Sequence, residues 1–183
     1  MKIIFFRHGE TDSNVKEIMQ GAGVDTPLNV KGIKQAQKLA DKAKGLGLEK
    51  IYSSTLTRAI QTATLVAAEC GLDVEPIEGV EEFHYGEVEG MLISEACEKF
   101  GTERVLFFTE RTDLYDTSLP GGETINQCLA RLLSAIERIK NENQGKCKCV
   151  GIFSHGAVMC LLYYHFFKVH HPIANCEWFE VEV

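Results

Sequence analysis

The sequence lacks any cluster of basic residues, although it is not poor in charge. Its 183 residues include 19 Lys and Arg against 26 Asp and Glu, which gives a formal net charge of −7 at pH 7. Nucleic acids and anionic membrane surfaces are bound through groups of Lys and Arg that neutralise several phosphates together. The sequence therefore argues against nucleic acid or a membrane as the main partner, and any anion site must be local.

The sequence has no C-x-x-C motif, and no secretory leader is expected because the apolar run 2–6 is too short for one. It has seven cysteines, an odd number scattered along the chain. This usage fits reduced thiols, so we predict a cytoplasmic protein. At strand period Cys147 and Cys149 would face one side of a sheet, and we interpret both as core residues.

No uninterrupted apolar run of membrane length is present either. The apolar stretch 149–169 is broken by Ser154, His155 and Gly156, and His165 stands near its end. Such groups are costly in lipid, and the first part of the stretch is short and β-branched. The pattern predicts a buried strand followed by a buried helix.

Short apolar segments alternate with segments of helical periodicity. Strands are predicted at 2–6, 50–54, 149–153 and 178–183. Helices are predicted from Asn29 as the cap to Gly45, over 57–70 up to Gly71, and over 123–143 and 157–167. The last helix is apolar on every side, so we expect it to be deeply packed. This alternation is typical of a three-layer αβα fold with a doubly wound, mostly parallel sheet.

The length and the 45% hydrophobic content suit a single domain over residues 1–183. Its least regular part is 79–120, with short helical patterns at 93–100 and 102–109. Excursions of this kind over the carboxyl edge of a parallel sheet form lids or specificity walls, and we predict that role here. The sequence is compatible with a monomer or a homo-oligomer.

Polar residues follow three of the predicted strands. Arg7-His8-Gly9 comes after the first, Ser53-Ser54 leads to Arg58 after the second, and Ser154-His155-Gly156 follows the third. Ligands bind outside the carboxyl ends of strands in open parallel sheets, and glycines let the backbone approach a ligand closely. Two Arg and two His at one edge need a dianion to neutralise them, and a phosphoryl group is the obvious candidate.

A neutral imidazole between cations can attack phosphorus, because neighbouring positive charge disfavours its protonation. The leaving alkoxide then needs a proton from a carboxylic acid. The stretch 80–90 offers Glu81, Glu82, Glu87 and Glu89. Spacing alone does not choose among them.

Three motifs occur in a fixed order: "RHGET" with Asn14, "SSTLTRAIQTA" at 53–63 and "FSHGAV" at 153–158, with "PLNVKGIKQA" and "PGGET" as lesser landmarks. Together they resemble the histidine phosphatase superfamily, the phosphoglycerate mutase-like proteins. The resemblance implies a phosphohistidine on His8, a phosphate pocket completed by Arg7, Arg58 and His155, and Glu82 as the acid/base, without a metal. It also implies substrate-binding roles for Asn14, Gln20, Gly21, Tyr85, Gly156 and Ala157.

The same resemblance leaves two activities, which differ in what accepts the phosphoryl group. Water as the acceptor gives a phosphatase, and a retained sugar acid gives a mutase that uses 2,3-bisphosphoglycerate. The mutase branch has an arginine where Phe83 stands and a longer basic insert, whereas 91–119 supplies only Lys99, Arg104 and Arg111. We therefore predict hydrolysis of a small phosphorylated metabolite with no cofactor, and keep the mutase as the alternative.

Two further alternatives belong to other classes. A zinc site could draw on His165, His170, His171, Cys160 and Cys176, yet the spacing His155-x4-Cys160-x4-His165 does not fall on one helix face. A non-catalytic phosphate-binding module is the other alternative. The presence of both His8 and Glu82 counts against it.

Overall fold

The computed structural model describes residues 1–110 and 117–183. One sheet runs through it, with the strand order β3-β2-β4-β1-β5. Its strands are β1 (Lys2–Arg7), β2 (Lys50–Ser53), β3 (Val74–Pro76), β4 (Cys149–Ser154) and β5 (Trp178–Glu182). All neighbours pair in parallel except β5, which runs antiparallel to β1. The predicted mostly parallel sheet is thus confirmed.

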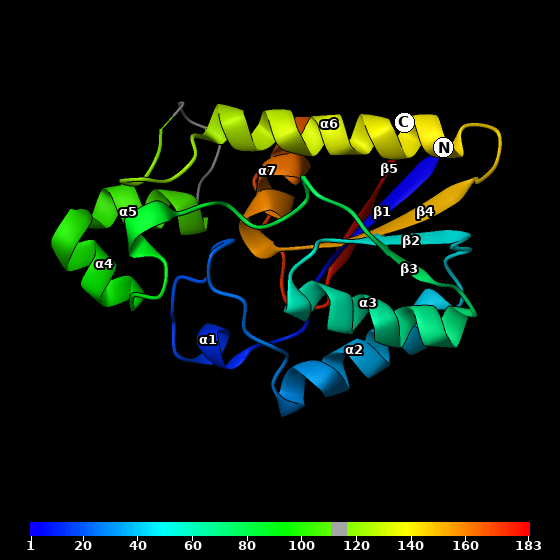
Figure 1. Ribbon diagram of the computed structural model, residues 1–183, viewed down its shortest axis with the longest axis horizontal. Helices are drawn as coiled ribbons and strands as arrows, with labels where there is room; N and C mark the ends of the chain where they lie inside the picture. Colours follow the sequence, from blue (N-terminus) through cyan, green and yellow to red (C-terminus); the bar gives the residue numbers. More distant parts are fainter. Residues whose placement is uncertain (111–116) are drawn as a thin grey trace.

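Helices cover both faces of the sheet (Figure 1). On one face lie α2 (Val30–Ala43) and α3 (Thr57–Cys70), and on the other α6 (Ile125–Asn143) and α7 (Gly156–Phe167). Along β1, Ile3 and Phe5 join the core under α6 and α7, whereas Ile4 and Phe6 join the core under α2 and α3. Because both faces are buried, β1 has to be apolar along its whole length.

The helix ends follow local capping chemistry. The Asn29 side chain accepts the Gly32 N–H at 2.8 Å and starts α2 as predicted, but α2 ends at Ala43, before Gly45. Gly71, at φ 68°, ends α3 as predicted. Three elements were not expected: α1 (Asp12–Val15), β3 and the 3₁₀ helix η1 (Gly86–Val88) have four, three and three residues and are too short to show a period.

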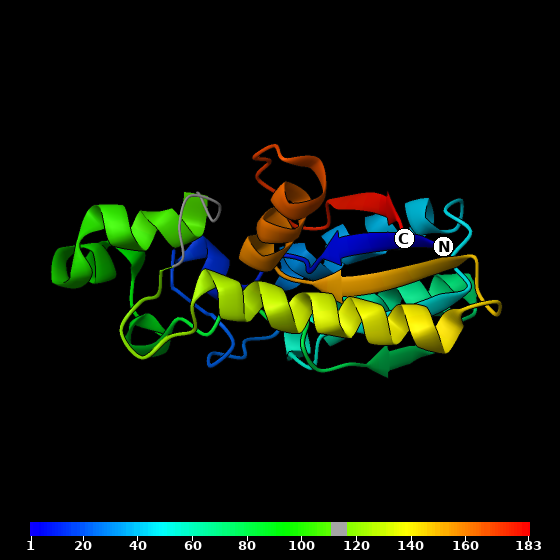
Figure 2. The same ribbon diagram turned by 90° about the horizontal axis from the view of Figure 1, so that it is seen from above.

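Two packing expectations were wrong. Helix α7 is buried at Leu161 and Leu162, but it is only half-buried over 163–166, and Phe167 is 43% exposed. Figure 2 shows the end of this helix pointing away from the sheet, where Tyr163 and Phe167 keep ring contacts with Phe179 of β5. Cys149 packs under α2 and α3, while Cys147 precedes β4 and packs on the opposite side, because strand period does not extend to it.

Residues 79–110 and 117–120 lie beyond the carboxyl edge of the sheet, where Figure 1 shows α4 (Ile93–Phe100) and α5 (Thr102–Glu110) side by side. A short 3₁₀ helix, η1 (Gly86–Val88), precedes them. This segment is tied to the sheet where the Ser154 hydroxyl donates to the Val80 carbonyl oxygen at 2.7 Å. Its role as a lid and the assignment of 1–183 to one domain stay predictions.

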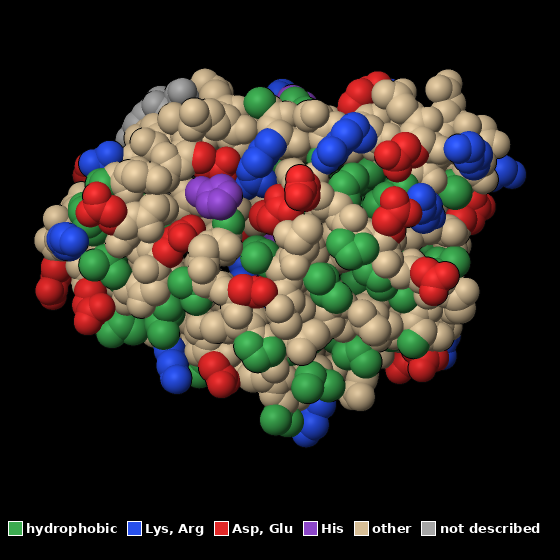
Figure 3. Space-filling model, viewed as in Figure 1, with side chains coloured by type: hydrophobic (Ala, Val, Ile, Leu, Met, Phe, Trp, Pro, Cys, Tyr) green, Lys and Arg blue, Asp and Glu red, His purple; other side chains and the backbone are tan. Residues whose placement is uncertain are grey.

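The charged side chains are of mixed sign on the face drawn in Figure 3, where Lys and Arg are interspersed with Asp and Glu. Within 1–110 and 117–183, no helix has both the length and the apolar character needed to cross a membrane.

Candidate active site

A cavity of about 220 Å³ opens at the carboxyl ends of β1 and β4, next to the start of α7. It contains every site residue predicted from the sequence except His155, which lies behind His8. Six further lining residues were not predicted, and most are apolar: Ile18, Met19, Ile93, Cys160, Pro172 and Ile173. The structure thus brings the predicted residues together, while their roles stay a prediction.

His8 stands at the end of β1 and is only 2% exposed. Its Nδ1 lies 2.7 Å from the carbonyl oxygen of Gly9, which can only accept, so Nδ1 carries the proton. The neutral ring therefore leaves the lone pair of Nε2 free. Burial lowers the pKa of His8 well below its usual value, and the charges of Arg58 and Arg7 lower it further. The sequence pointed to these charges, but burial is the larger cause.

His155 packs against His8, with the two ring centroids 5.2 Å apart. The Nε of Arg58 donates to its Nδ1 at 3.2 Å, and its Nε2 lies 2.8 Å from the Ser54 hydroxyl oxygen. Because an arginine can only donate, Nδ1 is unprotonated and the ring is neutral. Burial lowers the pKa of His155, as do the charges of Arg58, His8 and Arg7. His155 therefore fixes the orientation of Arg58.

Arg58 comes from the first turn of α3 and is 1% exposed. Besides His155, its guanidinium donates to the carbonyl oxygens of Val24 at 3.0 Å and Gly21 at 2.8 Å. Burial lowers its pKa, and the negative charges of Glu82 and Asp25 oppose that shift. The cation is therefore held rigidly between α3 and the loop that carries Gly21.

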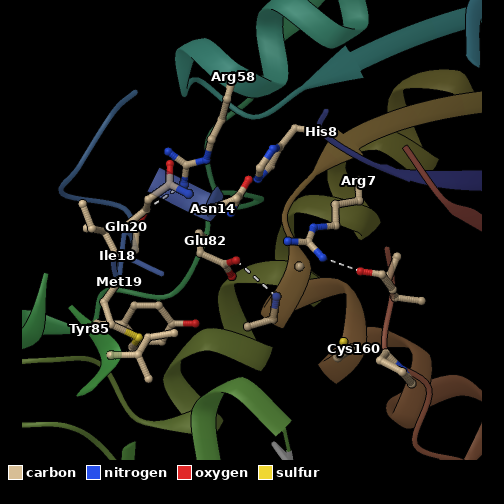
Figure 4. A pocket seen from close by; sticks show the side chains of 16 residues that line it. Arg7, His8, Asn14, Ile18, Met19, Gln20, Arg58, Glu82, Tyr85 and Cys160 are labelled. Carbon is tan, nitrogen blue, oxygen red and sulfur yellow. Dashed lines mark hydrogen bonds between the residues drawn. The ribbon is translucent and has the colours of Figure 1, made fainter. Parts of the chain in front are cut away.

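Arg7 precedes His8 and donates from Nη1 to the carbonyl oxygen of Ile173. Its Nε is buried and has no hydrogen-bond partner among the described residues. A buried donor without an acceptor is costly, and Figure 4 shows the Arg7 guanidinium directed into the pocket. An anion bound beside His8 would supply the missing acceptor.

The two glycines after the histidines do not both serve a ligand as expected. A Cβ at Gly9 would lie 2.6 Å from the Gly32 carbonyl oxygen, so Gly9 makes room for helix α2 rather than for a phosphoryl group. A Cβ at Gly156 would lie 3.0 Å from Cζ of Arg7. Gly156 therefore leaves space for an arginine that faces the pocket.

Glu82 projects into the pocket between the cations and the start of α7 (Figure 4). Its carboxylate accepts the N–H groups of Ala157 and Val158, each at 3.1 Å, and the Phe83 N–H at 3.1 Å. A helix amino end favours such a negative group. The Ala157 N–H, which we expected to face a phosphate, is therefore occupied by Glu82.

The loop that carries Glu82 is held from α6 by Arg131, a residue that sequence reasoning missed. Arg131 donates to the backbone carbonyl oxygens of Glu81 at 2.9 Å, of Glu82 at 3.0 Å and of Gly79 at 3.1 Å. It also pairs with Glu123 through two hydrogen bonds, of 3.0 and 2.6 Å. One side chain thus sets the path of the backbone on both sides of the carboxylate.

The remaining polar lining residues offer amide groups. The Asn14 Oδ1 accepts the Thr11 N–H at 3.1 Å, and the Gln20 Oε1 accepts from the hydroxyl of Thr26 at 2.6 Å. Within the described residues neither side-chain NH₂ has an acceptor, so both can donate to a ligand. Burial raises the pKa of Tyr85 well above its usual value, so its hydroxyl stays protonated.

The alternative zinc ligands do not form a cluster in the part of the chain that the structure describes. No group of three or more His, Cys, Asp and Glu residues is placed there to hold a metal ion. His171 instead lies 3.1 Å from a carboxylate oxygen of Glu177, and His170 stacks on Tyr164.

Comparison with known protein families agrees with this geometry. The model of the histidine phosphatase superfamily (branch 1) matches residues 3–182. The chain belongs to this superfamily. Within the histidine phosphatases, the phosphoglycerate mutase-like protein 4 of Arabidopsis thaliana is 34% identical over 165 residues, which are 88% of this chain and 69% of that protein.

Other relatives carry the names of phosphatases and mutases. The metal-independent phosphoserine phosphatase of Arabidopsis thaliana is 33% identical over 168 residues, 88% of this chain and 67% of that protein. A probable phosphoglycerate mutase of Escherichia coli is 32% identical over 163 residues, which are 88% of this chain and 73% of that protein. The solved structure of Bacillus stearothermophilus YhfR superposes with a TM-score of 0.87 at 28% identity, covering all of this chain and 91% of that one.

Proposed function

We propose that this histidine phosphatase hydrolyses a small phosphomonoester without a metal ion, through a phosphohistidine on His8. The observation that carries the proposal is the free Nε2 of a neutral His8, buried beside Arg7 and Arg58. The unpartnered Nε of Arg7 supports an anion at the same place.

The first half of the reaction forms the bond between His8 Nε2 and phosphorus and breaks the bond from phosphorus to the alcohol oxygen. Arg7 and Arg58 donate to the equatorial phosphoryl oxygens, where negative charge spreads in the transition state. Asn14 and Gln20 add hydrogen bonds from their free amide groups. Glu82 has to be protonated when the ester is bound, and it gives that proton to the departing alkoxide.

The second half of the reaction transfers the phosphoryl group to water. Water attacks phosphorus, Glu82 takes a proton from it, and the bond from phosphorus to Nε2 breaks. Inorganic phosphate leaves, and His8 is neutral again. His155 does not touch the phosphoryl group in this scheme, because both of its ring nitrogens are engaged by Arg58 and Ser54; it positions Arg58.

Trapping of the intermediate tests the proposal. Brief incubation with a phosphorus-labelled ester should give an acid-labile, base-stable phosphoenzyme, and excess chelator should not reduce turnover. His8→Ala should remove the label and lower turnover by at least about 10³-fold, with an unchanged circular dichroism spectrum. A label that survives acid would contradict the histidine mechanism.

The mutase is the second candidate, favoured by the relatives named as phosphoglycerate mutases. A substrate screen with and without 2,3-bisphosphoglycerate separates the two activities. Release of inorganic phosphate indicates the phosphatase, and isomerisation of phosphoglycerate without release indicates the mutase. A protein that turns over no member of a broad panel would be a phosphate-binding module instead.

A further inference from the structure

The pocket has a second, apolar side that the proposed phosphoryl transfer does not use. Met19 is buried there, and Ile18 and Ile93 are half-buried, whereas Ile173 and Cys160 lie on the Arg7 side of Glu82. In Figure 4, Ile18 and Met19 lie on the opposite side of Glu82 from Arg7 and His8. An ester bound with its phosphorus at His8 would therefore extend its alcohol part past Glu82 and along these side chains.

The charges of the pocket are distributed unevenly. Among its described lining residues, the Lys and Arg side chains are Arg7 and Arg58, and both lie at the His8 end. A carboxylate carried by the alcohol part would lie near Glu82 and the apolar side chains, with no cation of the described lining to pair with it. Burying an unpaired charge costs far more than burying an alkyl group of the same size.

The size of the cavity adds a second restriction. Its volume of about 220 Å³ must hold the phosphoryl group as well as the alcohol part. This is below the roughly 300–1,000 Å³ of most small-molecule sites. The alcohol part is therefore small.

We propose that the site is specific for phosphate esters of small, uncharged, largely apolar alcohols, and that Ile18, Met19 and Ile93 disfavour alcohols that carry a carboxylate. The inference rests on the hydrolase activity proposed above. It separates this protein from relatives whose names contain phosphoserine or phosphoglycerate, because both of those compounds carry a carboxylate.

Two esters of matched shape test the specificity in the unmodified protein. Isobutyl phosphate carries an isopropyl group where phosphoglycolate carries a carboxylate of the same branching. We expect kcat/KM for isobutyl phosphate to be higher by at least about tenfold, since a hydrophobic pocket discriminates even a methylene by 10- to 200-fold. Equal values, or a preference for phosphoglycolate, would overturn the inference.

A charge introduced on the apolar side should reverse the preference. Ile18→Lys should raise kcat/KM for phosphoglycolate and lower it for isobutyl phosphate. Val15→Lys is the matched control, because Val15 is 62% exposed in the same segment and does not line the pocket. It should change neither value. A shift of both variants in parallel would show a long-range charge effect and contradict a role for Ile18.

A failure of the specificity is distinguishable from a failure of the activity itself. Phenyl phosphate, which has a good leaving group, should be hydrolysed in a His8-dependent way whichever alcohol is preferred. Absence of that hydrolysis would remove the activity together with the inference. Its presence with a preference for carboxylates would remove the inference alone. The ratio of kcat/KM for isobutyl phosphate to that for phosphoglycolate in the unmodified protein tests the specificity even if Ile18→Lys does not fold.

Discussion

The two ends of the pocket are built by different parts of the fold. At the phosphoryl end, Arg7 and His8 come from β1, His155 follows β4, and Arg58 opens α3. Pairing of β1 with β4 sets Arg7 opposite Ser154, so sheet register fixes these side chains. At the alcohol end, the lining residues come from loops and from helices outside the sheet, with Ile18 and Leu92 joined by an isolated bridge.

This difference assigns the reaction to the phosphoryl end and the choice of substrate to the alcohol end. A phosphoryl site needs charges held in place before the reaction, and strand ends buried in a sheet provide that rigidity. Loop segments can change without disturbing the sheet, so they suit the recognition of different alcohols. The superfamily relatives, which carry names of different phosphatases and mutases, are consistent with a shared phosphoryl end and a variable alcohol end.

The largest effect that separates the two ends is expected at Glu82, which lies between them. Glu82→Gln should lower turnover of alkyl phosphates by roughly 10²- to 10⁴-fold, because an alkoxide needs the proton. Turnover of p-nitrophenyl phosphate should fall much less, because its leaving group needs none. Steady-state rates on both esters measure the contrast, and equal losses would assign the acid to another residue.

A smaller effect is expected at Arg131, which holds the backbone around Glu82. Displacement of a catalytic group by about 1 Å can cost up to about 10²-fold. Arg131→Ala should therefore reduce alkyl phosphate turnover within that range and p-nitrophenyl phosphate turnover less, the same selectivity as Glu82→Gln. A purely structural loss would lower both rates alike.

The matched control is Arg138→Ala on the same helix. Arg138 is exposed and donates to the Glu78 carbonyl oxygen, outside the stretch that carries the carboxylate. Its removal should leave the ratio of the two rates unchanged. A double variant with Glu82→Gln should show no further loss from Arg131→Ala if Arg131 acts through Glu82.

The phosphoryl end was predictable because its signals are local. An apolar strand that ends in Arg7-His8-Gly9 indicates both a buried strand and a polar tip, and three such ends imply one site in a parallel sheet. The reason for Gly9 was not predictable in the same way. A glycine in a sequence indicates that another group packs closely against the backbone, but it does not identify that group. At Gly9 the group is the backbone of Gly32.

The alcohol end left no comparable pattern. Ile18 and Ile93 are apolar residues far apart in the sequence, and no helical or strand period connects them. The role of Arg131 also has no sequence signal, because this side chain binds backbone carbonyl oxygens, which every residue has. Its place on α6 is that of an ordinary charged residue on an amphipathic helix. Only the path of the chain in space shows what it holds.

His8 and His155, the two histidines buried at the phosphoryl end, predict a pH dependence of stability. Both His8 and His155 have pKa values below 6.5 in the folded protein. Below about pH 6.5 the unfolded chain binds protons that the folded protein does not. The free energy of unfolding should therefore fall as the pH falls, by up to about 1.4 kcal/mol per pH unit for each histidine, and show no such slope above 6.5.

Urea unfolding at pH 7.5, 6.5 and 5.5 measures this slope. His8→Gln should make it shallower, because one of the two contributions is removed. His84→Gln serves as the control, since His84 is exposed, and it should leave the slope unchanged. A slope that persists in full after His8→Gln would show that other groups cause it.

The smallest effect is expected at Cys160, which lines the pocket from α7. Burial raises the pKa of its thiol, so the group is neutral and packs as an apolar side chain. Cys160→Ala opens space beside α7 and leaves Arg7, His8 and Arg58 in place. The KM for isobutyl phosphate should rise by less than about tenfold, while inhibition by inorganic phosphate, which reports only the phosphoryl end, should not change.

Cys70→Ala, outside the pocket, should alter neither value. If phosphate inhibition weakened together with the KM in Cys160→Ala, the two ends would be coupled through α7 rather than independent.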